Sequence, residues 1–155
     1  ITDENVAMRS TFKIGGVSAL SVYPKSVCDL CDAVKILKSA GVKYEIIGNA
    51  SNMLFAFDRY NGALIFTSGI NEYSIDGEAI YASCGTSLVR LANAAKENSL
   101  SGLEFASGIP ARIGGAIAMN AGAHGSQMSD IVEYTQVTEN DRKQLTFNIE
   151  DILLH

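Results

Sequence analysis

Residues 19–52 read ALSVYPKSVCDLCDAVKILKSAGVKYEIIGNASN, and this stretch decides the fold. Two short apolar runs, 19–23 and 43–47, each predict a strand. The segment between them has the apolar spacing of a helix. A strand, a helix and a second strand in this order predict a β-α-β unit, in which a right-handed crossover joins two parallel strands.

The predicted helix is marked at both ends. Ser26 is a favourable N-cap, and Asp29 occupies the position of the capping-box partner. Gly41 is a residue type that commonly ends a helix. Between these ends, apolar residues recur at helical spacing: Val27, Leu30, Cys31, Val34 and Leu37.

The second half of the chain predicts a further set of elements. We expect strands at 63–67 and 79–84, a helix over 87–98, and a hairpin formed by 131–138 and 144–149. The first ten residues are polar and predict no element. A boundary between two subdomains is weakly marked near residues 68–74.

Composition excludes several classes of function. The chain has 155 residues, of which 47% are hydrophobic and 19% charged, and this is typical of a folded globular protein. The net charge of −5 and the lack of a Lys/Arg run argue against nucleic-acid binding. No apolar stretch approaches the ~20 residues of a membrane span, and no signal peptide is visible. Three cysteines do not make a disulfide framework, so we expect a cytoplasmic protein.

Two glycine-bearing segments are candidates for binding a ligand. The first, Gly48 to Asn52, follows a predicted strand, where a turn could bring backbone N–H groups to a pyrophosphate; a plain turn is the alternative. The second runs from Ser107 to Ala116 and on from Met119 to Ala123, and a large flat ligand could lie against its small residues. Tight backbone packing is the alternative for the second segment.

Other motifs predict no chemistry. Neither segment has the glycine spacing of a P-loop or of a Rossmann dinucleotide site. Cys28 and Cys31 form a Cys-x-x-Cys at the start of a helix, but they are expected to be structural, and no metal site is predicted. His124 and Arg112 are expected to be surface residues, although Arg112 could reach a phosphate.

Five segments in order and spacing resemble the UDP-N-acetylenolpyruvoylglucosamine reductase family (MurB). They span nearly the whole chain, and five matches in register are far more specific than any one of them. The segments are Thr11 to Gly16, Tyr23 to Ser26, Gly48 to Leu54, Ser101 to Pro110, and Gly114 to Ala123.

The resemblance implies an α+β fold, a two-subdomain FAD-binding fold of the vanillyl-alcohol-oxidase (PCMH) type. Residues 1–70 and 71–155 would form the two FAD-binding subdomains, the second incomplete, with the substrate domain absent. The family uses NADPH and FAD to convert UDP-N-acetylglucosamine enolpyruvate to UDP-N-acetylmuramate in peptidoglycan precursor synthesis. The partner implied is a nucleotide-sugar, with no nucleic acid, membrane or obligate protein partner.

The resemblance also implies which residues bind the cofactor. The first segment would contact the FAD pyrophosphate, and the second would lie along the pyrophosphate, the ribityl chain and the ring. The implied FAD-binding residues are Gly48, Asn49, Ala50, Ser51, Asn52, Met53, Gly108, Ile109, Pro110, Ala111, Gly114, Gly115, Asn120, Ala121 and Gly122.

The chain departs from the family at three positions and in one larger respect. Ala50 and Ala111 stand where the family usually has glycine, and His124 where it commonly has tyrosine. If position 50 needs a positive φ, alanine there costs on the order of 1 kcal/mol. In the family the catalytic arginine follows a run that residues 150–155 resemble, so we assign no catalytic residue and expect this chain alone to be inactive. A non-catalytic module of the same fold, or another flavin oxidoreductase of that fold, is the alternative.

Overall fold

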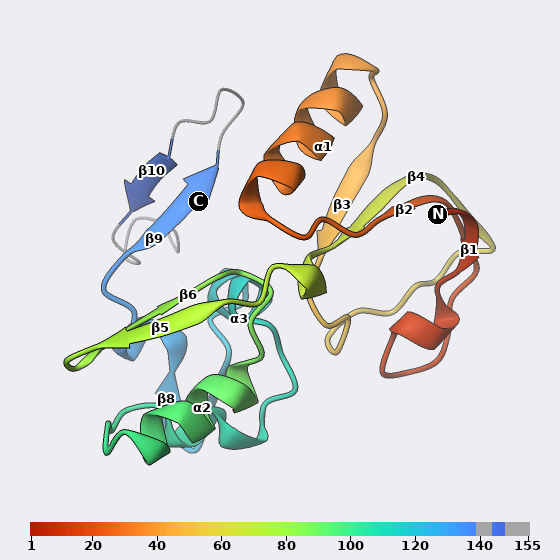
Figure 1. Ribbon diagram of the computed structural model, residues 1–155. Helices are drawn as coiled ribbons and strands as arrows, with labels where there is room; N and C mark the ends of the chain where they lie inside the picture. The colour runs from red at the N-terminus through yellow and green to blue at the C-terminus, as the bar shows by residue number, and fades with distance from the viewer. Residues whose placement is uncertain (139–143, 148–155) are drawn as a thin grey trace.

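The computed structural model describes residues 1–138 and 144–147. A four-stranded sheet and one long helix make up the N-terminal part of the molecule, and Figure 1 shows them apart from the green-to-blue elements that follow. The N-terminal elements are β1 (Thr2–Asn5), η1 (Ala7–Arg9), β2 (Val17–Val22), α1 (Val27–Ser39), β3 (Tyr44–Ile47), β4 (Arg59–Phe66) and η2 (Thr67–Gly69).

The predicted β-α-β unit is present, but its two strands are not neighbours. The strand order is β1-β2-β4-β3, so β4 lies between β2 and β3 and is parallel to both. Residues 62–66 of β4 are buried, as expected for a central strand that is covered on both faces. The predicted strand 63–67 is four residues too short at its start, because the polar beginning of β4 is held by pairing with β2.

The capping box at the start of α1 is confirmed. The Ser26 hydroxyl accepts a hydrogen bond from the Asp29 N–H at 3.1 Å, and the Asp29 carboxylate accepts one from the Ser26 N–H at 3.1 Å. Near the C-terminal end of α1, Leu37 packs against Ala63 and Ile65 of β4. This contact fixes α1 on one face of the sheet.

The expectation that the first ten residues form no element is wrong. β1 pairs antiparallel with β2, and three of its four residues are exposed. An edge strand that is held by backbone hydrogen bonds needs no hydrophobic alternation, so its polar sequence did not mark it.

The second part of the described chain has its own hydrophobic core. Leu88 and Leu91 of α2 pack with Phe105, Ile113 and Met128. Its elements are β5 (Tyr73–Asp76), β6 (Ala79–Ala82), α2 (Leu88–Glu97), η3 (Glu104–Gly108), α3 (Ile113–Ala118), β7 (Gly122–Ala123), β8 (Ser126–Gln127), η4 (Met128–Asp130), β9 (Thr135–Thr138) and β10 (Gln144–Phe147). The clustered hydrophobic residues belong either to 6–66 or to 73–132, and the division into subdomains at residue 70 remains a proposal.

Several predicted boundaries in this part need correction. β6 ends at Ala82, before Cys84, because the chain turns there and the Gly85 N–H donates to the Ile70 carbonyl. The hairpin of β9 and β10 is antiparallel as predicted, but its first strand begins at Thr135, not at residue 131. The segment between its two strands, 139–143, and the predicted end of its second strand, 148–149, lie outside the described residues.

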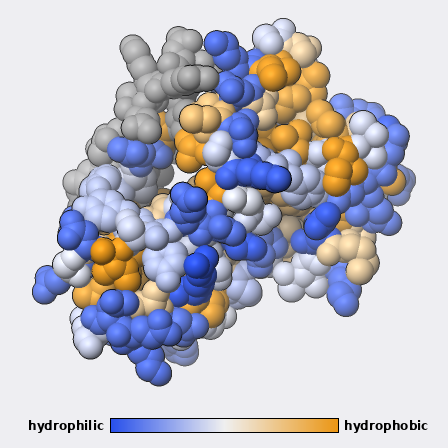
Figure 2. Space-filling view, in the orientation of Figure 1, coloured by the Kyte–Doolittle hydropathy of each residue, from blue (hydrophilic) through white to orange (hydrophobic). Residues whose placement is uncertain are grey.

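Apolar side chains are exposed over α1 and β3, as the orange colouring in Figure 2 shows; Val27, Ile36 and Ile46 are the large exposed ones on these elements. Within the part of the chain that the structure describes, no helix is long and apolar enough to cross a membrane. Among the same residues, no three His, Cys, Asp or Glu side chains gather as metal ligands would.

Candidate functional site at the junction of the two parts

The carboxyl ends of the three parallel strands meet at one edge of the sheet. β3 leads into the Gly48 loop and β4 into the Thr67 turn. The two are tied together, since the Thr67 hydroxyl donates a hydrogen bond to the Ile47 carbonyl at 3.3 Å. This is the edge at which ligands usually bind in sheets with parallel strands.

The second glycine-bearing segment reaches this same edge. The Asn49 side-chain amide donates a hydrogen bond from Nδ2 to the Pro110 carbonyl at 2.7 Å. A Cβ added to Gly48 would lie 3.3 Å from the Cβ of Arg112. The structure therefore brings together two segments that are 61 residues apart in sequence.

Ala50 adopts the left-handed conformation that its place in the loop requires. Its φ is +49°, and its side chain is only 4% exposed. A left-handed alanine costs roughly 1–2 kcal/mol. The methyl group packs in the cluster of Val6, Ile47 and Phe55, and burial of one such group returns about 0.8 kcal/mol. Alanine is thus accommodated where the family usually has glycine.

The first loop presents a row of free backbone donors. Within the described residues, none of the N–H groups from Gly48 to Met53 donates a hydrogen bond to another protein group. Asn49, Asn52 and Met53 are exposed, while Gly48 and Ser51 are half-buried. Successive unpaired N–H groups at a turn form a concavity that suits an anion, so this loop fits a pyrophosphate.

The second segment combines packed and open glycines. A Cβ added to Gly114 would lie 3.0 Å from the Cβ of Cys84, which is close backbone packing. A Cβ added to Gly108 or to Gly115 would meet nothing within 4 Å. Tight packing therefore accounts for Gly114, whereas Gly108 and Gly115 are exposed and leave room for a ligand.

Residues 120–122 have different partners. The Asn120 side chain accepts a hydrogen bond from the Ser129 N–H at 2.9 Å and donates to the Gln127 side chain at 3.1 Å. Gly122 pairs with Gln127 in the short β7–β8 ladder. These bonds tie the segment to β8 and η4, so its predicted role beside the flavin remains a proposal.

Arg112 lies in the junction and is not the surface arginine that the sequence predicted. It is half-buried, and its guanidinium donates from Nη1 to the Gly85 carbonyl at 3.1 Å. Its Nε is buried without a hydrogen-bond partner. No local pattern in the sequence marks this burial, because it results from the approach of Gly48 and Gly85 from other parts of the chain.

Thiol chemistry has no support at this junction. Burial raises the pKa of the Cys84 thiol above its usual value, with smaller opposing effects of backbone hydrogen bonds. The neutral thiol is favoured, so Cys84 is expected to pack against Gly114 and not to act as a nucleophile.

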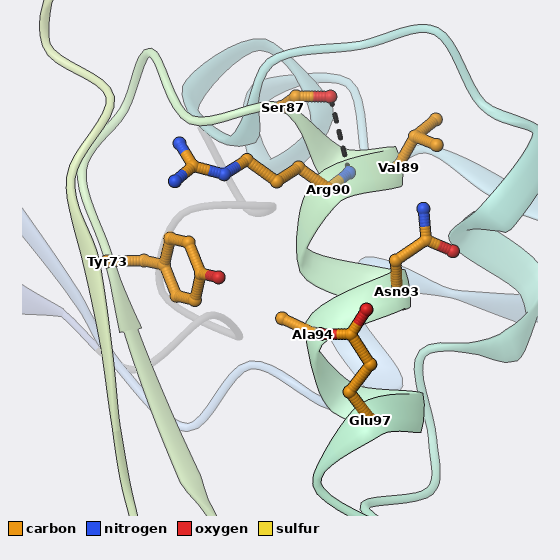
Figure 3. Close-up of a pocket in the computed structure, with 7 residues that line it drawn as sticks. All are labelled: Tyr73, Ser87, Val89, Arg90, Asn93, Ala94 and Glu97. Carbon is orange, nitrogen blue, oxygen red and sulfur yellow. Dashed lines mark hydrogen bonds between the residues drawn. The ribbon is translucent and has the colours of Figure 1, made fainter.

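Two surface pockets lie away from the junction. The one drawn in Figure 3 has a volume of about 440 Å³, and there the Arg90 guanidinium of α2 stacks 4.8 Å from the centre of the Tyr73 ring. The other, of about 420 Å³, is lined in part by Glu104, His124 and Asp130. Neither is lined by the Gly48 loop or by Pro110 to Arg112, and the free donors and open glycines favour the junction as the cofactor site.

Comparison with known proteins shows which family the chain is similar to. The model of the family described as FAD binding domain matches residues 18–148. The UDP-N-acetylenolpyruvoylglucosamine reductase of Caldicellulosiruptor saccharolyticus is 40% identical over 132 residues, which cover 85% of this chain and 43% of that protein. That of Bacillus subtilis is 39% identical over 142 residues, 91% of this chain and 47% of that protein. The chain thus spans about half the length of the curated relatives it matches.

Solved structures show the same fold. The UDP-N-acetylenolpyruvylglucosamine reductase (MurB) from Thermus caldophilus superposes with a TM-score of 0.76 and 27% identity, over 96% of this chain and 52% of that one. Aclacinomycin oxidoreductase, at 15% identity, superposes with a TM-score of 0.68 over 92% of this chain and 31% of that one, and shows the fold alone. The chain therefore belongs to the FAD-binding domain family, and within it resembles the UDP-N-acetylenolpyruvoylglucosamine reductases.

Proposed function

We propose that the junction between the Gly48 loop and the segment around Pro110 holds FAD, and that the chain is the FAD-binding part of an NADPH-dependent reductase. The substrate would be UDP-N-acetylglucosamine enolpyruvate and the product UDP-N-acetylmuramate, a precursor of peptidoglycan. The single observation that carries the proposal is the 2.7 Å hydrogen bond from Asn49 to the Pro110 carbonyl. It joins the two segments that the resemblance assigns to one cofactor.

The pyrophosphate would lie on the Gly48 loop. The N–H groups from Gly48 to Met53 donate to no protein acceptor in the described residues, so they are available to phosphate oxygens. The Ser51 hydroxyl and the Asn52 amide add neutral donors beside them. Ala50, with its φ of +49°, would keep these N–H groups on one concave side of the turn.

The flat part of the cofactor would lie along the second segment. Gly108 and Gly115 leave open space where a side chain would stand, and this is the close approach that a ring against backbone requires. Ile109 and Ala111 are half-buried and would give that surface its apolar character. Bound FAD would supply the hydride transfer, and this chain would position it.

The reaction itself is inferred from the matched relatives. Their names give UDP-N-acetylenolpyruvoylglucosamine as the group that they reduce. We assign no catalytic residue among residues 1–155. A cytoplasmic setting is supported by Cys28, Cys31 and Cys84, which are all free thiols.

An FAD titration followed by flavin fluorescence tests the cofactor proposal. We expect saturable binding of one FAD per chain, and quenching of the flavin by the protein. A folded chain that leaves FAD fluorescence unchanged would contradict the proposal and favour a non-catalytic module of the same fold.

The reductase proposal needs a second measurement. In the natural protein in which this sequence occurs, bleaching of the flavin band by NADPH and its recovery on addition of the enolpyruvyl substrate are expected. Recovery by oxygen alone, with no effect of that substrate, would instead favour another flavin oxidoreductase of this fold.

A further inference from the structure

Arg112 is a half-buried cation in the middle of the proposed cofactor site. It directly follows Ala111 and is the N-cap residue of α3, and its Cβ lies against Gly48. Its backbone faces Ser87 across an isolated antiparallel bridge. Three distant parts of the chain, around Gly48, Gly85 and Pro110, therefore meet at this one side chain.

The hydrogen bonds of Arg112 are incomplete. A guanidinium has five N–H donors, and the structure gives this one a bond from Nη1 to the Gly85 carbonyl at 3.1 Å. The Nε is buried without a partner. A buried donor without an acceptor is costly, and more so when it carries charge.

No carboxylate neutralises Arg112 in the described part of the chain. The ion pairs found there join Arg9 to Glu4 and Arg59 to Asp3. An unpaired, half-buried guanidinium destabilises a fold unless an anion completes its surroundings. The free N–H groups of the Gly48 loop, which also suit an anion, adjoin this residue.

We propose that Arg112 is the cationic anchor for the pyrophosphate of FAD, so that this site selects the dinucleotide over flavins that lack a pyrophosphate. The inference rests on the proposed function and deepens it. Arginine binds phosphate through two parallel, charge-assisted hydrogen bonds, which add to those that the N–H row donates. In a chain of net charge −5, a local cation also favours the approach of a doubly negative group.

The competing role is structural. Through its bond to the Gly85 carbonyl, Arg112 could simply hold the Gly85 turn against the second segment. Loss of that bond would loosen the junction for every flavin alike. Loss of an anion contact would lower the affinity only for ligands that carry the pyrophosphate. This difference separates the two roles.

The test compares the affinities of FAD and riboflavin for the wild-type chain and for Arg112→Gln, Arg112→Lys and Arg59→Gln. Arg59→Gln is the matched control, because it removes one positive charge from an exposed ion pair at the opposite end of β4. We expect Arg112→Gln to lower the affinity for FAD about tenfold or more and to change the affinity for riboflavin by less than about twofold. Arg112→Lys should recover part of the loss, and Arg59→Gln should change neither affinity.

The salt dependence of flavin affinity is a second test, and it uses the wild-type chain alone. For the wild-type chain, FAD affinity should fall with ionic strength while riboflavin affinity stays nearly constant. The inference is wrong if Arg112→Gln lowers the affinities for FAD and for riboflavin equally. It is also wrong if the affinity for FAD depends neither on salt nor on the substitution. In both cases the proposed function stands. If the wild-type chain binds no flavin, the proposed function fails first, and the inference fails with it.

Discussion

Asn49 donates a hydrogen bond from its side-chain amide to the carbonyl of Pro110 at 2.7 Å, across 61 residues of sequence. This bond closes the junction between the sheet and the second part of the molecule. Because Asn49 is exposed and its neighbours are free donors, it is suited to ordering a binding loop more than to stabilising the core.

Replacing Asn49 with alanine should therefore affect binding more than folding. Loss of one hydrogen bond costs about 1 kcal/mol, which corresponds to about fivefold in FAD affinity. The free energy of unfolding should change by less than about 1 kcal/mol, because no buried group is left without a partner. FAD titration and urea denaturation check the two values. Asn61→Ala, at an exposed position of β4, is the control and should leave FAD affinity unchanged.

Ala50 should tolerate glycine but not valine. Ala50→Gly relieves a left-handed backbone by roughly 1–2 kcal/mol, but loses a buried methyl group and adds freedom to the unfolded chain. These effects nearly cancel, so the free energy of unfolding should change by less than ~1 kcal/mol. Ala50→Val should destabilise by ~2 kcal/mol or more, since a β-branched residue at this φ is strained and the site is closely packed. Equal effects of the two substitutions in urea denaturation would contradict this account.

Gly115 should matter for the cofactor and not for the fold. An added Cβ there meets nothing within 4 Å, and alanine favours a helix over glycine by up to ~1 kcal/mol. Gly115→Ala should keep or raise the melting temperature. It should lower the affinity for FAD, since the methyl group would occupy the open space. Gly85→Ala is the contrast: its Cβ would overlap the carbonyl oxygens of Thr67 and Ile70, so it should destabilise the fold itself. A Gly115→Ala protein with unchanged FAD affinity would place the ring elsewhere.

The acid side of the stability profile should depend on Glu4. Burial raises the pKa of its carboxyl, but hydrogen bonds from Tyr23 and Arg9, together with the positive charge of Arg9, outweigh this effect, so the pKa lies below its usual value. A lowered folded-state pKa contributes stability above the unfolded value, near pH 4.3, and that contribution is lost as pH falls through the folded value. Glu4→Gln should flatten this part of the curve of unfolding free energy against pH. If the wild-type and variant curves run parallel below pH 5, the hydrogen bonds to Glu4 contribute nothing to the free energy of unfolding.

The hydroxyl of Tyr23 should ionise only late in an alkaline titration. Burial and its 2.6 Å hydrogen bond to Glu4 raise the pKa of its hydroxyl to about 12. The stability that this proton supplies is complete below about pH 10 and declines as pH rises toward the folded value. Absorbance of tyrosinate during an alkaline titration should show a component near pH 12, and Tyr23→Phe should remove it. A late component that persists in Tyr23→Phe would show that it belongs to another tyrosine.

The sequence by itself determined several local elements and the two glycine-bearing segments. Ser26, Asp29 and Gly41 mark α1 because capping and helix termination depend on neighbouring residues alone. The same holds for α2, since the helix predicted over 87–98 agrees with the structure to within a residue at each end. The glycine-bearing segments could be recognised because their residue types and order are themselves the signal.

Tertiary structure decided what depends on residues far apart. The position of β4 between β2 and β3 follows from packing Leu37 of α1 against Ala63 and Ile65, which no local pattern encodes. β1 escaped prediction because backbone pairing at an edge leaves no hydrophobic period. The burial of Arg112 likewise exists only once Gly48 and Gly85 have converged on it. The hydrophobic period of a segment depends only on residues that are close in sequence. Strand order and the binding junction depend on contacts between residues that are far apart in sequence.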